Sequence, residues 1–250
     1  MALIELQRTD GIALVELNRP EKRNALSPDL IAALHGTLDV LESDATLRVV
    51  ILGGIGKSFC AGMDLKGVLD DAAAMGGMLH ALAMATGRLR RLPVPTIARV
   101  HGAAIGGGCG LAAVTDLAVT HKTAKLGYPE VTLGVCPAVV APWLIRKIGA
   151  GPARAMLLRG GTHDGTTALA MGLVDRVVPR EELDDVVMTM ARDLAKGGRD
   201  AIAVTKQWVN ELDGSIDDEM LSRGAGLSAQ VIAGDEAQLR LRPLFGPKDA

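Results

Sequence analysis

Aromatic side chains are nearly missing from this sequence, which has 2 Phe, 1 Tyr and 2 Trp among 250 residues. Hydrophobic residues still make up 48% of the chain, so the core has to be built from Ala, Val, Leu, Ile and Met. Only 3 cysteines occur, Cys60, Cys109 and Cys136. Their odd number and wide spacing fit neither a disulfide framework nor a CxxC metal site. We therefore expect a reduced, cytoplasmic protein that is held together by packing.

An excess of charge of either sign is also missing, since the formal net charge is −2. The chain therefore lacks the basic footprint that nucleic acid or an anionic membrane surface attracts. No uncharged apolar run approaches the roughly 18 residues of a membrane-spanning helix. Met1-Ala2-Leu3 runs directly into an alternating strand pattern and does not resemble a signal peptide. We expect neither nucleic acid nor a membrane as a partner.

Several well-known chemical motifs are incomplete here. Gly56-Lys57-Ser58 resembles the end of a phosphate-binding loop, but Ile51 stands where that motif needs glycine. The glycines of 106–110 lack the spacing of a dinucleotide fingerprint at a first strand-to-helix turn. The 5 histidines form no H-x-x-x-H pair, and no G-x-S-x-G segment occurs. The sequence therefore predicts no metal site, no redox cofactor and no serine hydrolase.

Strand and helix patterns alternate over the first 178 residues, and helical patterns follow. Runs at 3–6 and 12–17 predict a hairpin, and Ser27-Pro28 predicts the start of a helix over 28–43. Further strands are expected at 49–52, 95–100, 117–120, 124–127 and 173–178. Further helices are expected at 68–91 with an interruption at Gly76-Gly77, at 138–148 with a kink at Pro142, at 152–159, from Thr162 or Asp164, and at 181–196, 199–212 and 216–233. This order is typical of α/β layers with appended helices.

The most informative stretch is Arg99–Val114, RVHGAAIGGGCGLAAV. It begins as a strand, crosses three consecutive glycines at 106–108 and enters an Ala/Leu-rich run that predicts a helix. Glycines allow a ligand to approach the backbone closely, and the first turn of a helix has N–H groups without partners. Such N–H groups stabilise an anion or an oxygen that becomes negative during a reaction.

Four motifs occur in order along the chain. They are NRPEKRNAL at 18–26, SFCAGMDLK at 58–66, HGAAIGGGCG at 101–110 and LGYPEVTLGVCP at 126–137. Together they resemble the enoyl-CoA hydratase/isomerase family, also called the crotonase family. The resemblance extends over about residues 3 to 233 and rests on the order and spacing of all four motifs.

This resemblance implies an α/β fold, a crotonase-like spiral of ββα units with a helical C-terminal trimerisation region. Residues 1–180 would form the spiral core with the acyl-CoA site. Residues 181–250 would form the helical region that completes the site and the trimer interface. The implied partners are an acyl-CoA substrate and further copies of the chain, in a homotrimer or hexamer. Coenzyme A is then part of the thioester substrate, and no separate cofactor is implied.

The resemblance also assigns roles to individual residues. The backbone N–H groups of Met63 and Gly107 would form an oxyanion hole for the enolate of the thioester. Losing one such donor typically costs about 2.7–4 kcal/mol of transition-state stabilisation. Arg23, Ala61 and Lys66 would line the nucleotide part of coenzyme A. The basic segment 240–245 is expected to contribute there as well.

The identity of the reaction depends on two positions. Typical hydratases of this family carry two glutamates, and this chain has Gly110 at the first position and Glu130 at the second. Glu130 lies among apolar residues, so desolvation is expected to raise its pKa and to suit it to acid–base work. One carboxylate can move a proton between two carbons, which favours an isomerase. A hydratase that works with one glutamate, another enolate reaction such as decarboxylation, and a silent acyl-CoA binding protein remain alternatives.

The wall of an acyl pocket is open to two interpretations. Met63, Met75, Met78, Met84 and Trp143 could line it, since methionine adapts to varied shapes. Each could equally well belong to the ordinary core. Asp116, directly before an expected strand, is interpreted as structural.

Overall fold

The fold is built on one long, mostly parallel sheet and a second, smaller one. The structure is a computed structural model and describes residues 2–66 and 68–246. The main sheet has the order β1-β2-β3-β4-β6-β9, made of β1 Ile4–Thr9, β2 Ile12–Leu17, β3 Val49–Gly54, β4 Thr96–Val100, β6 Leu117–His121 and β9 Arg176–Val178. The second sheet has the order β5-β7-β8, made of β5 Ala103–Ile105, β7 Lys125–Gly127 and β8 Thr162–Asp164.

The connection between the two sheets repeats along the chain. A strand of the main sheet is followed by a short strand of the second sheet and then by a helix. This order holds for β4, β5 and α3 (Gly107–Val114) and again for β6, β7 and α4 (Ala141–Ile148). Because β4 pairs with β6 and β5 with β7, both in parallel, each repeat advances along both sheets. The result is the spiral of ββα units that the sequence motifs implied.

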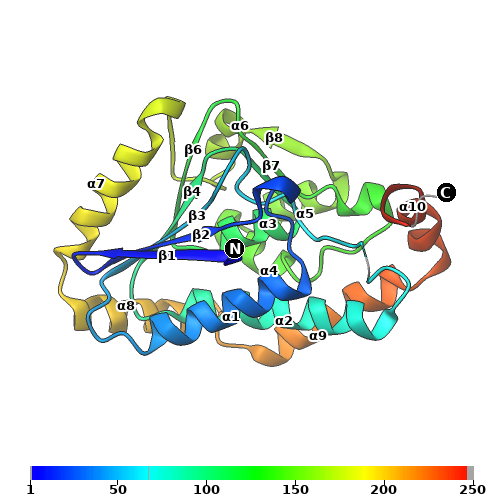
Figure 1. The fold of residues 1–250 in the computed structure, drawn as a ribbon, viewed down its shortest axis with the longest axis horizontal. Coiled ribbons are helices and arrows are strands. Elements are labelled where there is room, and N and C mark those ends of the chain that lie inside the picture. The colour runs from blue at the N-terminus through cyan, green and yellow to red at the C-terminus, as the bar shows by residue number, and fades with distance from the viewer. Residues whose placement is uncertain (1, 67, 247–250) are drawn as a thin grey trace.

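Helices cover both faces of the main sheet. On one face α7 (Leu183–Ala195) packs against Val49 and Ile51. On the other face α1 (Pro28–Glu42) and α2 (Ala72–Arg91) pack with Val50 and Leu52. Figure 1 shows α7 on one side of the sheet and α1, α2 and α9 together on the other. Since β3 is covered on both faces, all of its residues are buried, as is typical of a central parallel strand.

The remaining helices are short or belong to the C-terminal part. They are α5 Ala150–Arg159, α6 Gly165–Ala170, α8 Arg199–Leu212, α9 Asp218–Ile232 and α10 Asp235–Phe245, with 3-10 turns at Pro20–Lys22, Glu130–Leu133 (η2) and Arg180–Glu182. The expected helices at 28–43, 152–159, 181–196, 199–212 and 216–233 are confirmed to within a few residues. Within the described part of the chain, none of the helices combines the length and apolarity needed to cross a lipid bilayer.

Two sequence expectations about helices are wrong. Gly76 and Gly77 do not interrupt α2, which runs unbroken from its N-cap Asp71. Gly76 instead faces α9, where a Cβ would lie 3.9 Å from that of Ala229. Pro142 causes no kink, because α4 begins at Ala141 and proline in the first turn displaces no helical hydrogen bond.

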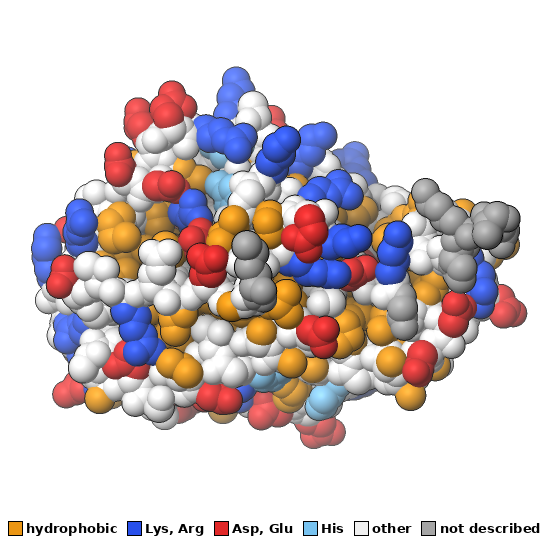
Figure 2. All heavy atoms as spheres, viewed as in Figure 1, with side chains coloured by type: hydrophobic (Ala, Val, Ile, Leu, Met, Phe, Trp, Pro, Cys, Tyr) orange, Lys and Arg blue, Asp and Glu red, His pale blue; other side chains and the backbone are white. Residues whose placement is uncertain are grey.

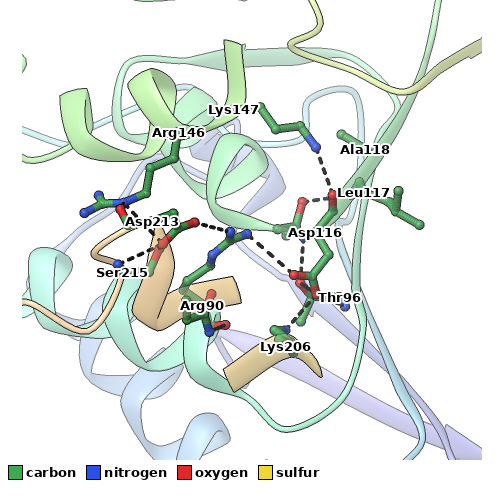
Figure 3. A network of polar contacts seen from close by, with 12 residues as sticks. Arg90, Thr96, Asp116, Leu117, Ala118, Arg146, Lys147, Lys206, Asp213 and Ser215 are labelled. Carbon is green, nitrogen blue, oxygen red and sulfur yellow. Dashed lines mark hydrogen bonds and ion pairs between the residues drawn. The ribbon is translucent and has the colours of Figure 1, made fainter. Parts of the chain in front are cut away.

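A network of charged side chains anchors α8 to the sheet (Figure 3). The carboxylate of Asp116 accepts from the N–H of Thr96 and from Lys206 Nζ, both at 2.7 Å. Lys206, on α8, also donates to the Val94 carbonyl at 2.8 Å. Arg90 lies 3.5 Å from Asp116 and bonds Asp213 at 3.0 Å. The structural interpretation of Asp116 is confirmed by these contacts.

Candidate active site

A cavity of about 120 Å³ opens beside the glycine turn that precedes α3. Its wall comes from the loop after β3, α2, the glycine turn, the stretch from η2 to the start of α4 and the last two helices. The lining residues are Ala61, Gly62, Met63, Leu65, Leu79, Leu82, Ile105, Gly106, Gly107, Pro129, Glu130, Leu133, Val135, Cys136, Pro137, Val139, Val140, Ser228, Ile232, Leu241 and Phe245. The structure thus brings Ala61, Met63, Gly107 and Glu130 to one cavity, although they come from three separate motifs.

Backbone hydrogen bonds hold the 60–64 loop beside the glycine turn. Cys60 N–H donates to the Ala103 carbonyl at 2.9 Å, and Ile105 N–H donates to the Cys60 carbonyl at 3.0 Å. Glycine is required here at 106, which has a φ of +53°. A Cβ at Gly106 would also lie 2.7 Å from Glu130 Oε1. The carboxyl of Glu130 therefore lies directly against the turn.

The hydrogen-bonding pattern of the described residues leaves the backbone N–H of Met63 without an acceptor. On its two sides, Leu26 N–H donates to the Gly62 carbonyl at 2.7 Å and Asp64 N–H donates to the Leu26 carbonyl at 2.8 Å. Within the described chain, no carbonyl or side chain accepts from Met63 N–H. An ion pair between Arg19 and Asp64 at 2.6 Å fixes the same loop from outside.

The N–H of Gly107 belongs to the first turn of α3, because the helix begins at that residue. Such N–H groups have no partner inside the helix, and the helix dipole makes this end favourable for negative charge. The N–H of the preceding Gly106 is used differently, since it donates to the Gly127 carbonyl at 2.8 Å. Gly107 also lines the cavity, and it lies close to Met63, whose Cγ would be 3.9 Å from a Cβ at Gly107.

Burial raises the pKa of Glu130 to about 7. No described protein atom donates to its buried Oε2. The expected upward shift, caused by an apolar environment, is confirmed in direction and cause. Near neutral pH such a carboxyl is present both as acid and as base in comparable amounts, which is the property that general acid–base catalysis uses.

The space beside Gly110 is occupied by a neighbouring apolar side chain. A Cβ at Gly110 would lie 2.9 Å from Val140 Cβ and would overlap Val140 Cγ1. Val140 is buried and lines the cavity. The side of the cavity next to the position expected for a first glutamate is therefore hydrocarbon, and Glu130 supplies the one carboxyl among the described lining residues.

The residues expected near the nucleotide lie apart from the cavity, with one exception. Ala61 lines it, and its N–H donates to the Arg23 carbonyl at 3.0 Å. Arg23 and Lys66 are exposed and do not line the cavity. The backbone contact places Arg23 beside Ala61, on the outer side of the loop. The segment 240–245 is the last part of helix α10, and it contributes Leu241 and Phe245 to the cavity wall rather than basic side chains.

Of the five candidate wall residues, Met63 lines the cavity and the other four do not. Met75 and Met78 are buried core residues of α2, and Met84 packs against that core. Trp143 is also buried, and its Nε1 donates to the Thr86 hydroxyl at 2.9 Å. The resemblance implied that residues 181–250 complete the site, but the sequence did not single out Ser228 and Ile232 of α9. It also placed the segment 240–245 near the nucleotide, whereas Leu241 and Phe245 line the cavity. The spacing of Ser228 and Ile232 places them on the same face of a helix, but no local signal indicated what that face packs against.

Comparison with known proteins agrees with these motifs. The family model described as enoyl-CoA hydratase/isomerase matches residues 7–238. The chain belongs to the enoyl-CoA hydratase/isomerase family. A putative enoyl-CoA hydratase of Thermus thermophilus is 37% identical over 207 residues, 81% of this chain and 82% of that protein. A short-chain-enoyl-CoA hydratase of Clostridium acetobutylicum is 32% identical over 208 residues, 82% of this chain and 80% of that protein.

Solved structures show the same fold. The crystal structure of an enoyl-CoA hydratase/isomerase from Mycobacterium paratuberculosis superposes with a TM-score of 0.89, at 23% identity. The superposition covers 98% of this chain and 99% of the other. The crotonase-like fold implied by the motifs is thus confirmed.

Proposed function

We propose that this chain acts on enoyl-CoA thioesters through an enolate, with Glu130 as the acid and base. The thioester oxygen would accept hydrogen bonds from the N–H groups of Met63 and Gly107. The main support for this proposal is the position of the half-buried Glu130, whose carboxyl lines the cavity beside the glycine turn, has its Oε2 buried and has a pKa of about 7. Preorganised donors of this kind stabilise charge that develops during the reaction.

Hydration of a 2-enoyl-CoA is the first candidate reaction, since the relatives from Thermus thermophilus and Clostridium acetobutylicum carry the name hydratase. Glu130 takes a proton from water while the water oxygen bonds to C3. The electron pair of the C2–C3 double bond moves onto the thioester as an enolate. Glu130 then returns its proton to C2, so that one carboxyl serves both steps.

Migration of a double bond is the second candidate, and the packing of Val140 against Gly110 favours it. Glu130 removes a proton from C2 of a 3-enoyl-CoA, and the electron pair forms a dienolate held at the thioester oxygen. The same proton is then delivered to C4, which leaves a 2-enoyl-CoA. This reaction needs no second carboxylate and no water in the cavity.

Two assays on the purified protein separate the reactions. Hydration removes the enoyl absorbance of crotonyl-CoA, and isomerisation creates that absorbance from a 3-enoyl-CoA. Glu130→Gln should lower the active reaction by roughly a hundredfold or more, the usual contribution of a positioned acid or base. Glu211→Gln is the matched control, because Glu211 is an exposed residue of α8. Full activity of Glu130→Gln would disprove the assigned role.

Coenzyme A is proposed to enter as part of the substrate, with its nucleotide near Arg23, Ala61 and Lys66. Arg23 and Lys66 are exposed beside the loop that carries Ala61, where their charges suit phosphate groups. No other cofactor enters either reaction.

A homotrimer or hexamer is proposed as the assembled state. In support, α8 carries an apolar stripe at helical spacing that no described residue covers: Val204, Trp208 and Leu212 are 66%, 58% and 68% exposed. Exposed apolar stripes of this kind mark interaction surfaces. Figure 2 shows charged side chains of both signs interspersed with hydrophobic ones on the face of the molecule that it presents. The division at residue 180 and a cytoplasmic location stay predictions.

A further inference from the structure

We propose that Asn24 is a positioning residue of the oxyanion hole, because its buried amide holds the loop that carries Met63. This inference rests on the proposed function and adds to it the residue that fixes one of the two donors. Asn24 belongs to the first of the four sequence motifs, and it does not line the cavity. It therefore acts on the reaction through the loop and not through the substrate.

The side chain of Asn24 is fully buried, and all of its polar atoms are bonded inside the protein. Its Nδ2 donates to the carbonyls of Ser58 at 2.9 Å, Ile55 at 3.1 Å and Phe59 at 3.2 Å. Its Oδ1 accepts from the N–H of Arg19 at 2.8 Å. A carboxamide supplies both donors and an acceptor, which an aspartate or a leucine of similar size does not. The amide thus ties the chain just before the donor loop to the first motif.

Backbone hydrogen bonds extend this attachment as far as Met63. The Ala61 N–H donates to the Arg23 carbonyl at 3.0 Å. Leu26 pairs with Met63 in a parallel bridge, in which Leu26 bonds the residues on either side of Met63. In such a bridge the N–H of the skipped residue points away from the partner segment. The direction of the Met63 N–H is therefore set by where the segment 23–26 lies.

The backbone of this segment is held in a costly conformation. Arg23 and Asn24 both have a left-handed backbone, with φ of +53° and +55°. Residues other than glycine rarely adopt this region, and they stay there only where their surroundings hold them, often at functional sites. The bonds of the Asn24 amide supply that hold. Glycine at 54 makes room for the amide, since a Cβ there would lie 2.6 Å from Nδ2.

An ion pair supports the same loop at its other end. Arg19 Nη1 donates to the Asp64 carboxylate at 2.6 Å and to the Ala25 carbonyl at 3.1 Å. Hydrogen bonds between charged groups are the stronger kind. Asp64 directly follows Met63, so the chain on both sides of the donor is attached to the first motif.

The test compares two variants with a matched control. Asn24→Gly removes the amide and keeps the left-handed backbone accessible, because glycine adopts positive φ without steric cost. Asp64→Asn keeps the shape of the side chain and removes the charge that Arg19 binds. Asn210→Ala is the control, since Asn210 is a buried asparagine of α8 whose Nδ2 donates to the Arg90 carbonyl at 3.3 Å.

Two readouts on the full-length protein report on the oxyanion hole. The first is kcat and KM with crotonyl-CoA and with a 3-enoyl-CoA. The second is the infrared stretching frequency of the thioester carbonyl in bound butyryl-CoA, labelled at that carbonyl with a heavy carbon isotope. Hydrogen bonds to the carbonyl oxygen lower this frequency, and the saturated acyl group can be neither hydrated nor isomerised. Urea unfolding measures the stability of each variant.

Asn24→Gly should lower kcat by roughly a hundredfold, as expected for a displacement of about 1 Å in a reacting geometry. Its KM should change by less than about threefold, since the lost interaction belongs to the transition state. It should also lose most of the downward shift of the carbonyl frequency. Asp64→Asn should lower kcat by about tenfold with part of the shift lost. Asn210→Ala should keep kcat and the shift, although it loses stability.

Unchanged kcat and an unchanged carbonyl frequency in Asn24→Gly would overturn the inference and leave the proposed function standing. A loss of kcat without a change of frequency would also overturn it, as would an equal loss of kcat in Asn210→Ala. If Asn24→Gly does not fold, Asp64→Asn decides, and parent-like values of kcat and frequency would then refute the inference. A parent protein that turns over neither substrate, or that leaves the carbonyl frequency of butyryl-CoA unshifted, overturns the proposed function itself.

Discussion

The close packing of Gly110 against Val140 can be measured with a double-mutant cycle. Gly110→Ala adds one methyl group at a point that lies 2.9 Å from Val140 Cβ and overlaps Cγ1. Overpacking of this kind costs about 1–3 kcal/mol, and alanine in a helix returns about 1 kcal/mol relative to glycine. The net expectation is a loss of about 0–2 kcal/mol in the free energy of unfolding.

The second variant, Val140→Gly, removes all three side-chain carbons, among them Cβ and Cγ1, which lie closest to a Cβ at Gly110. A loss of about 0.8 kcal/mol per buried carbon plus a cavity term gives roughly 3 kcal/mol. With both changes, the nearest Val140 atom to the new methyl is its Cα at 3.9 Å, an ordinary contact. The double variant should therefore lose only about 1–2 kcal/mol instead of the roughly 3–5 kcal/mol of the sum, which is a coupling energy of roughly 2–3 kcal/mol.

Urea unfolding followed by circular dichroism gives the four free energies, with the slope m checked for constancy. A Gly110→Ala variant that is more stable than the parent would refute the packing argument, because only the helix propensity would then be felt. The same cycle controls the catalytic experiment. Gly110→Glu should fold and gain hydration of crotonyl-CoA only together with Val140→Gly, because Val140 occupies the space that the new side chain needs.

Three further predictions follow from the buried charges and the exposed stripe. Since the pKa of Glu130 is raised to about 7, its native carboxyl keeps a proton that the unfolded chain has lost. The contribution of this protonated carboxyl to the free energy of unfolding is therefore complete at low pH and is lost as the pH rises through 7. Glu130→Gln should raise the free energy of unfolding by about 3 kcal/mol at pH 8 and by far less at pH 4.5. Equal gains at both pH values would contradict the assigned pKa. Lys206→Ala removes a buried partner of Asp116 and should cost about 3–5 kcal/mol in urea unfolding. The control Lys196→Ala, at an exposed ion pair, should cost less than about 1 kcal/mol. Similar losses in the two variants would show that burial of the network is unimportant. Trp208→Ser should convert the assembly to smaller species in light scattering, and a monomeric parent protein would disprove the trimer.

Much of the fold could be predicted because its signals are local. The hairpin turn at Asp10-Gly11 lies where expected, and Ser27 caps α1 by accepting from the Leu30 N–H at 3.3 Å. The motifs also predicted that Met63, Gly107 and Glu130 lie at one site, and all three line the same cavity. Motifs carry information about tertiary position that no single residue contains. The raised pKa of Glu130 followed from its apolar neighbours alone.

The errors concern features that depend on a partner distant in the sequence. Gly76 was interpreted as an interruption from its low helix propensity, but close packing of α2 against α9 outweighs that propensity. The space beside Gly110 is decided by Val140, which lies 30 residues further along. Leu241 and Phe245 reach the cavity only because α10 folds back over the η2 segment, and no local pattern specifies that path.

The origin of the cavity wall has a consequence for biosynthesis. Met63 and Glu130 can take up their positions as soon as their strands have formed, but Leu241 and Phe245 come from the final helix described. On the ribosome, where folding proceeds from the N-terminal end, the nascent chain carries an open, solvated Glu130 until α10 has emerged and docked. The wall around the carboxyl is therefore completed late, and a ribosome-bound chain shorter than 245 residues should be inactive even though its sheets are complete.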